Sequence, residues 1–189
     1  PPQKLLVITF TREAAVSMRQ RFLQISPQHT TVNFGTFHSC FYQILLRSGR
    51  VSPGNILNEK QKKELIYPVL KKIKAHNALS ATDLPELAKN LLTAIGYYKN
   101  TGDLQSSMDR LPEDWKNDFA QVYSGYEEAR KRIRGLDFDD MLKECEELLQ
   151  KDDALRAYWQ NLFSYILIDE FQDINYRQYC IVRLLAQKH

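Results

Sequence analysis

The sequence predicts an α/β protein that carries an all-helical segment in its middle. Short strand-like segments, each followed by a polar turn and an amphipathic helix, occur near both ends, at 4–9, 32–36 and 165–168, and the first and third contain the apolar runs 5–8 and 165–168. Such runs are typical of strands in a parallel sheet. Between 52 and 135 the apolar residues recur at three- and four-residue spacing, which indicates helices. We therefore expect a parallel sheet built from residues 1–51 and 136–189, interrupted by a helical lobe at 52–135.

The composition is that of an ordinary globular protein, and it excludes several classes. Of the 189 residues, 43% are hydrophobic and 26% are charged, and no apolar run approaches the roughly 18 residues of a membrane span. Three cysteines and four histidines show no metal-ligand or disulfide spacing. We expect reduced thiols and a cytoplasmic location. The start at Pro1, without an initiator Met or signal peptide, predicts a cut into a longer chain.

The net charge of +3 conceals an uneven distribution along the chain. Lys and Arg outnumber Asp and Glu by six to one in residues 1–51, which gives +5. The counts are 14 to 11 in 52–135, or +3, and 6 to 11 in 136–189, or −5. A basic beginning suits a polyanionic partner and an acidic end suits a metal or a basic partner, although solvated surface charge also accounts for each block.

The first predicted strand, 4–9, leads into a predicted helix at 12–23. Thr11 is suited to be its N-cap, and Glu13 in the first turn suits the helix dipole. Free backbone N–H groups at such a turn can bind a phosphate. Ordinary capping explains Thr11 equally well.

The second strand, 32–36, ends in a Gly-Thr turn before a predicted helix at 37–46. His38 lies in the first turn of that helix, where a histidine is more often a packed or capping side chain than a functional group. Gly49 follows the helix at the position that commonly adopts a left-handed conformation.

The central lobe is predicted to contain helices at 58–75, 83–100 and 115–134, after a linker at 51–58. Pro68 lies inside the first of these and is expected to disturb it locally. Thr82 or Asp83 is the expected cap of the second. Basic residues interleaved with aromatics can bind a nucleic-acid backbone and stack on bases. The candidates are Tyr97, Tyr98, Lys99 and the cluster 130–134, and a solvated face with core aromatics is the equally good alternative.

Three aspartates, Asp137, Asp139 and Asp140, open the helix that begins near 136 and ends near 150. Acidic residues in a first helical turn are favoured by the helix dipole alone, so we expect no metal site there. Shorter helices are predicted at 152–161 and 176–187.

The third strand, Tyr165–Ile168, is expected to be buried on both faces, and Asp169 and Glu170 follow it directly. Ligands of open α/β folds bind at the carboxyl ends of the strands. There Asp169 can hold Mg²⁺, usually through water, and Glu170 can orient a water for attack on a phosphoryl group. A strand that merely ends at a polar turn has the same local sequence.

Taken together, four stretches resemble the UvrD/Rep type of superfamily 1 DNA helicase. Residues 8–18 look like motif Ia, and Phe34-Gly35-Thr36-Phe37-His38-Ser39 looks like motif Ib. Residues 136–142 are similar to the segment that returns the family's chain to its first domain. Residues 168–175, with Gln178 beyond, look like motif II, the Walker B element. Their order and separations make the resemblance specific over essentially the whole chain.

The resemblance implies a partial RecA-like sheet, subdomain 1A, at 1–51 and 136–189, with a helical subdomain 1B inserted at 52–135. It implies that Asp169 coordinates the Mg²⁺ of ATP, that Glu170 is the catalytic base, and that Gln172 and Asp173 support the nucleotide site. It also implies that Thr9, Phe10, Thr11, Thr36 and His38 lie along a single-stranded DNA path. The expected partners are single-stranded or partly duplex DNA and a second motor domain, with no membrane, in a bacterial-type cytoplasm.

The sequence also departs from the family pattern. None of its seven glycines precedes a Lys-Thr or Lys-Ser pair, so no phosphate-binding loop is present in these residues, and motif III is also missing. We therefore expect a fragment of an ATP-dependent DNA helicase that binds no ATP or Mg²⁺ and has no ATPase activity by itself. The alternative is a non-catalytic, DNA-binding helicase relative that lacks the phosphate-binding loop. A nuclease that uses the 137–140 and 169–173 carboxylates fits the motif order poorly.

Overall fold

The computed structural model describes residues 1–52, 54–73 and 84–187. The chain divides into two compact units, one of Pro1–Val51 with Met141–His189 and one of Ser52–Asp140. All three strands of the described residues belong to the first unit, and the second unit is helical.

The first unit is built on a parallel sheet of three strands, β1 (Leu5–Thr9), β2 (Asn33–Thr36) and β3 (Tyr165–Ile168). The strand order is β2-β1-β3, and both neighbours run parallel to β1. Three strands that run in the same direction end at the same edge of the sheet, so the turns that follow them lie together. The predicted α/β class with a parallel sheet is confirmed.

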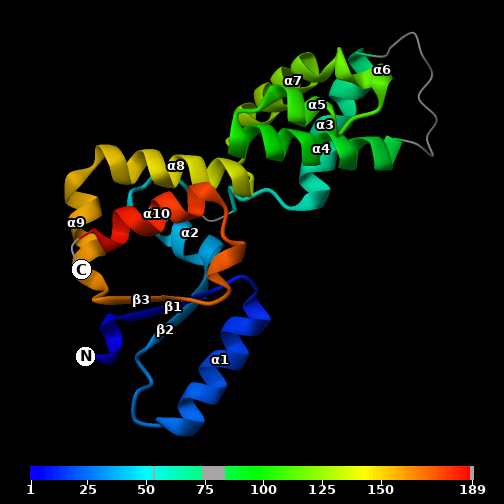
Figure 1. Cartoon of the computed structure of the whole chain (residues 1–189). Helices are drawn as coiled ribbons and strands as arrows, with labels where there is room; N and C mark the ends of the chain where they lie inside the picture. Colours follow the sequence, from blue (N-terminus) through cyan, green and yellow to red (C-terminus); the bar gives the residue numbers. More distant parts are fainter. Residues whose placement is uncertain (53, 74–83, 188–189) are drawn as a thin grey trace. The chain divides into compact units, whose positions relative to one another are not determined.

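Helices cover the two faces of this sheet unequally (Figure 1). Helix α1 (Arg12–Ile25) packs against β1 and β2 on one face, and α2 (Phe37–Arg47), α9 (Asp153–Leu162) and α10 (Tyr176–Ala186) lie on the other. The side chain of Thr11 accepts a hydrogen bond from the Ala14 N–H at 3.0 Å, which confirms it as the N-cap of α1. Gly49 has a φ of +72° just beyond α2, the left-handed conformation expected of it.

Strand β3 is not buried on both faces, contrary to the expectation from its apolar sequence. Tyr165 is 69% exposed and Leu167 is 53% exposed, because within the described residues β3 is an edge strand and α1 packs over its neighbours instead. Ile166 and Ile168 point to the other face, where they are half-buried. An apolar run identifies the strand, but it does not show whether helices cover one face of that strand or both.

Within the described residues, five helices lie wholly in the second unit and pack around one apolar core. They are α3 (Glu59–Ile73), α4 (Leu84–Thr101), α5 (Leu104–Met108), α6 (Glu113–Lys116) and α7 (Phe119–Arg132). The core includes the fully buried Ile66, Leu91, Phe119 and Tyr126. Lys74, Ala75 and the expected caps Thr82 and Asp83 lie outside the described residues.

The predicted helix 115–134 is interrupted, and α5 was not predicted at all. The Asp118 N–H bonds to the Trp115 carbonyl three residues back, which separates α6 from α7. Asn117 and Asp118 at this point have low helix propensity because their side chains compete for backbone hydrogen bonds. Helix α5 is a single short turn that Asp103 caps through Ser106, and such a turn carries too few residues to show a periodicity.

Helix α8 (Phe138–Lys151) begins in the second unit and continues without interruption into the first. The sequence places the boundary at 135/136, whereas the compact units divide at 140/141. The five intervening residues pack with the helical unit because Asp137 and Asp140 bind side chains of α4 and α7. Among the described helices, none is both long and apolar enough to cross a membrane.

Candidate functional site

Residues from the three sequence motifs converge at the carboxyl edge of the sheet. Thr9, the last residue of β1, is the register partner of Thr36, the last residue of β2. The Asp169 N–H, just beyond β3, donates to the Ile8 carbonyl at 2.9 Å. The turns that contain Phe10, Thr36 and Asp169 therefore lie side by side although the sequence separates them widely.

The β1–α1 turn presents one exposed aromatic ring above a buried threonine. Thr9 is fully buried, and its hydroxyl donates to the Thr11 carbonyl at 2.9 Å, so its side chain fixes the shape of the turn. The Phe10 ring is 37% exposed and meets Phe37 edge-on, with centroids 5.4 Å apart. This places an exposed aromatic surface at the carboxyl edge of the sheet, where a base can stack.

The β2–α2 turn is held by a reciprocal capping box. The Thr36 side chain accepts from the Ser39 N–H at 3.2 Å, and the Ser39 side chain accepts from the Thr36 N–H at 2.9 Å. Gly35 leaves room for this arrangement, because a Cβ there would lie 2.8 Å from Ser39 Oγ. His38 is partly buried in the first turn of α2, and burial lowers the pKa of its imidazole, which favours the neutral ring at pH 7.

A cavity of about 310 Å³ lies between α1 and the β2–α2 turn. It is lined by Arg12 and Arg19 from α1 and by Gly35, Thr36 and Ser39 from the opposite side. The two arginines were not among the residues that sequence reasoning selected. Their separation by seven residues, two helical turns, is the signal that places both on one face of α1. Guanidinium groups beside polar hydroxyls suit a phosphodiester.

The β3 end carries two carboxylates with different backbone settings. Asp169 is half-exposed, and its carboxylate forms no hydrogen bond or ion pair within the described residues. Glu170 adopts a left-handed conformation (φ 50°, ψ 47°), which costs a non-glycine residue about 1 kcal/mol or more. The Gln172 amide donates to Glu170 Oε2 at 2.6 Å, and the Asp173 N–H donates to the Glu170 carbonyl at 2.9 Å. Gln172 and Asp173 thus hold the exposed Glu170 in this conformation.

This donor set fits a hydrated magnesium ion. Mg²⁺ prefers oxygen ligands, keeps several waters, and in nucleotide sites takes one or two protein carboxylates together with phosphate oxygens. Asp169 and Glu170 supply the carboxylates at an accessible sheet edge. No Gly-rich loop ending in Lys-Thr or Lys-Ser is present in the 189 residues, so the phosphate part of such a site is not among them.

Two basic side chains that the sequence offered for DNA binding are buried instead. Lys99 and Arg130 are 5% and 8% exposed in their side chains, and both form ion pairs with carboxylates inside the helical unit. Tyr98 packs edge-on against Phe119 and Tyr123, so it belongs to the core. A basic residue in a helix has the same local sequence whether it faces water or a buried carboxylate.

Most of the basic side chains of the cluster 130–134 lie on the surface of the helical unit. Lys131, Arg132 and Arg134 are exposed. Tyr97 lies under the Arg110 guanidinium, whose carbon is 4.0 Å from the ring centroid. Among the candidates that the sequence offered in this lobe, Lys131, Arg132 and Arg134 are the exposed basic side chains.

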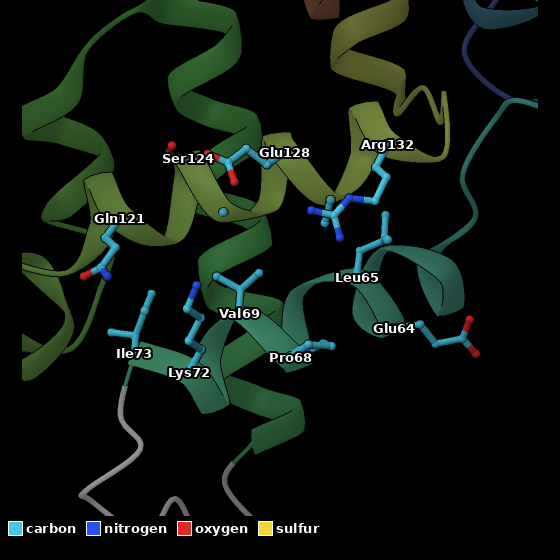
Figure 2. Close-up of a pocket in the computed structure, with 12 residues that line it drawn as sticks. Glu64, Leu65, Pro68, Val69, Lys72, Ile73, Gln121, Ser124, Glu128 and Arg132 are labelled. Carbon is cyan, nitrogen blue, oxygen red and sulfur yellow. The ribbon is translucent and has the colours of Figure 1, made fainter.

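A larger groove, of about 500 Å³, lies between α3 and α7 in the helical unit (Figure 2). Leu65, Val69 and Ile73 form its apolar side on α3, and Arg132 lies at its rim on α7. The two helices approach closely at Gly125, where a Cβ would lie 2.7 Å from Val69 Cγ1. Of the candidate residues that the sequence predicts, the groove contains Arg132, from the basic cluster 130–134.

Comparison with known proteins places these features in context. Residues 1–189 match the sequence profile described as the UvrD/REP helicase N-terminal domain. The chain is 35% identical over 196 residues to the putative ATP-dependent DNA helicase YjcD of Bacillus subtilis, covering 98% of this chain and 24% of that protein. It is 33% identical over 193 residues to the ATP-dependent DNA helicase PcrA of Staphylococcus aureus, covering 99% and 26%. For PcrA of Staphylococcus epidermidis the identity is 34% over 197 residues, with 99% and 26% covered. The chain thus spans about a quarter of the length of these relatives.

Proposed function

The chain belongs to the UvrD/REP helicase N-terminal domain family, and from that premise we propose that it is part of the first motor domain of an ATP-dependent DNA helicase. Unit 1–51 with 141–189 corresponds in this proposal to part of the RecA-like subdomain 1A, and unit 52–140 to the helical subdomain 1B. The observation that carries the proposal is the convergence of the three motif turns at one sheet edge. A carboxylate pair beside a DNA-binding edge is what coupling ATP hydrolysis to movement on DNA requires.

We assign the nucleotide role to the β3 end. Asp169 holds Mg²⁺ and Glu170 positions the attacking water, while Gln172 and Asp173 keep Glu170 in its left-handed conformation. When bound, Mg²⁺ and ATP supply the reacting phosphoryl group and neutralise its charge. Support for this assignment comes from the Asp169 carboxylate, which has no partner among the residues that the structure describes, and from the exposure of Glu170.

The DNA role belongs to the neighbouring turns. Phe10 offers a ring for base stacking, and Thr11, Thr36 and His38 line the adjoining surface, while buried Thr9 shapes the first turn. Arg12 and Arg19 add phosphate contacts in the cavity beside Thr36. The +5 charge of residues 1–51 draws a polyanion to this edge.

Single-strand binding is tested by fluorescence anisotropy with a labelled oligonucleotide at several salt concentrations. We expect weak binding that falls with salt. Replacing both Arg12 and Arg19 with Ala should reduce the slope of log affinity against log salt by about 1.4, because each phosphate contact on a single strand contributes about 0.7. Arg21→Ala, an exposed arginine on the same helix that does not line the cavity, is the matched control. Equal slopes for the double variant and the control would remove the arginines from the DNA site.

The 189 residues by themselves are proposed to have no measurable DNA-stimulated ATPase activity. Asp169 and Glu170 offer ligands for the cation, but a phosphate cradle is not part of this sequence. The test is phosphate release with and without single-stranded DNA, using Glu170→Gln as the reference. A steady rate that Glu170→Gln abolishes would contradict the proposal.

A non-catalytic DNA-binding relative remains the second candidate, and the same observation favours it: none of the seven glycines precedes a Lys-Thr or Lys-Ser pair. The two candidates differ in the sequence that adjoins these residues in the gene. A Gly-Lys-Thr or Gly-Lys-Ser loop encoded shortly before Pro1 supports the motor domain, and a start codon there supports the non-catalytic relative.

A further inference from the structure

Five charged side chains meet inside the helical unit, where α4, α7 and the first turn of α8 come together. We call them the latch cluster: Lys99, Glu127, Arg130, Asp137 and Asp140. Lys99 Nζ is 2.7 Å from Glu127 Oε1, 2.7 Å from Asp137 Oδ2 and 3.0 Å from Asp140 Oδ1. Every member has a side chain no more than 13% exposed.

Arg130 binds the same carboxylates from the other side. Its Nη2 is 2.7 Å from Glu127 Oε2 and its Nε is 2.9 Å from Asp140 Oδ2, while Nη1 donates to the Gly135 carbonyl at 2.7 Å. Asp137 and Asp140 also cap the first turn of α8 reciprocally. The Asp140 N–H donates to Asp137 Oδ1 at 2.8 Å, and the Asp137 N–H donates to Asp140 Oδ2 at 3.3 Å. The cluster therefore holds this turn to α4 and α7.

The three carboxylates could by their spacing hold a metal ion, but the Lys99 ammonium already lies among them. The charges of the cluster do not balance, since two cations face three carboxylates. Around it, the Tyr126 hydroxyl donates to Asp137 Oδ2 at 3.4 Å, and the Asn100 amide donates to Asp139 Oδ1 at 2.6 Å. Lys62 of α3 adds a favourable charge near Asp139, and Tyr123 of α7 faces Glu127 and Asp140. An excess buried negative charge is costly unless a proton neutralises it.

The carboxyl groups of Asp137 and Asp140 are placed to share that proton. Their carboxylate oxygens lie within 4.8 Å of each other, and two like charges that close in a buried site favour a proton on one of them. Burial and the neighbouring Asp137 raise the pKa of Asp140 to about 7. Burial works against ionisation of Asp137 as well, but the Lys99 charge and the hydrogen bonds outweigh it and lower the pKa of Asp137.

We propose that the latch cluster is a proton-controlled device that fastens and releases the first turn of α8. With one proton on the Asp137–Asp140 pair, two cations balance two carboxylates and the turn stays on α4 and α7. When the proton leaves, Asp137 and Asp140 repel each other within the capping box and the turn opens more readily. Because α8 continues without interruption to Lys151, the latch controls the anchored end of a helix that the two units share. The latch depends on neither ATP nor DNA.

Amide hydrogen exchange on the full 189-residue chain tests the latch. After correction for the intrinsic pH dependence of exchange, protection at the Asp137 and Asp140 amides should fall about tenfold between about pH 6 and about pH 8 and then level off. This factor follows from linkage if the group titrates near 7 when fastened and near its ordinary value when released. Asp140→Asn keeps the shape and the accepting oxygen but removes the titration, so its protection should not change with pH. Glu128→Gln, an exposed change on α7, should retain the wild-type response.

A carbon-13 titration of the aspartate carboxyl groups in the unmodified chain tests whether the Asp137–Asp140 pair holds a proton near neutral pH, even if Asp140→Asn does not fold. We expect one carboxyl of the Asp137–Asp140 pair to titrate near neutral pH. Titration of both below about pH 5 would overturn the proposal. So would protection at the two amides that does not change with pH in the unmodified chain, or an equal pH response in Asp140→Asn.

Discussion

Replacing Lys99 with Met tests whether this lysine is a structural cation or a DNA contact. The substitution keeps an unbranched apolar stem in the buried position but removes the ammonium. Glu127, Asp137 and Asp140 would then face Arg130 as the one remaining cation of the latch cluster. The helical unit should lose stability, because carboxylates that were paired are left buried beside one another.

The expected loss in the free energy of unfolding follows from the burial of the ion pairs that Lys99 forms. Removing one partner of a buried ion pair costs about 3–5 kcal/mol, and for a chain of this length each kcal/mol lowers Tm by about 2–4 °C. Without Lys99 the native carboxylates bind protons more readily than the same groups in the unfolded chain. The variant's free energy of unfolding should therefore rise as pH falls, by up to about 2.7 kcal/mol over two pH units for one extra proton.

Urea unfolding followed by tryptophan fluorescence measures this loss of stability in the helical unit. Trp115 lies in the helical unit and Trp159 in the other, so a Trp159→Phe background makes Trp115 the sole reporter. Lys89→Met, on the exposed face of the same helix, is the matched control and should change the free energy of unfolding by less than about 0.5 kcal/mol.

A small loss for Lys99→Met would refute the reasoning, in particular one equal to that of Lys89→Met at about pH 7.5. A loss of DNA affinity in a variant that keeps its full stability would show instead that Lys99 binds the nucleic acid.

Three further predictions rest on local geometry. Gly125→Ala should lower the free energy of unfolding by about 1–3 kcal/mol, because its Cβ would lie 2.7 Å from Val69 Cγ1, and adding Val69→Ala should recover part of the loss in the same urea assay. Thr36→Ala should lose the cap of α2 and about 1 kcal/mol, measured as a lower Tm, whereas Thr36→Ser should keep both. In the unmodified chain, the pKa of Asp140 is raised to about 7, so the native state binds its proton more tightly than the unfolded state. Its contribution to the free energy of unfolding should therefore decrease from about pH 4 to about pH 7 and then level off, and Asp140→Asn should remove that slope in a urea series across pH.

Features that depend on neighbours in the sequence were predictable. The cap at Thr11 and the glycine beyond α2 follow from residue type at a helix end, and both occur as expected. The apolar runs identified β1 and β3 because a parallel strand needs apolar side chains in succession, whereas β2 was predicted from a short segment that ends in a Gly-Thr turn. The end of β3 at Asp169 placed two carboxylates at the sheet edge for the same reason.

Features that depend on distant partners were not predictable. The sequence could not show that Tyr165 and Leu167 are exposed, because the helices that bury a strand's side chains come from other parts of the chain. Nor could it select Arg12 and Arg19, whose cavity exists because β2 ends beside α1. Helix α5 escaped prediction because one turn has no period.

The sequence by itself determined the order of the motifs, the parallel sheet and the family, because each of these is written in residue types at fixed spacing. Only the tertiary structure decided which charged side chains are exposed and which are internal. Lys99 and Asp137 are 38 residues apart, and neither has a local signature of pairing. Their ion pair forms because α4 and the start of α8 meet in the core, where a charge without a partner would be too costly to bury.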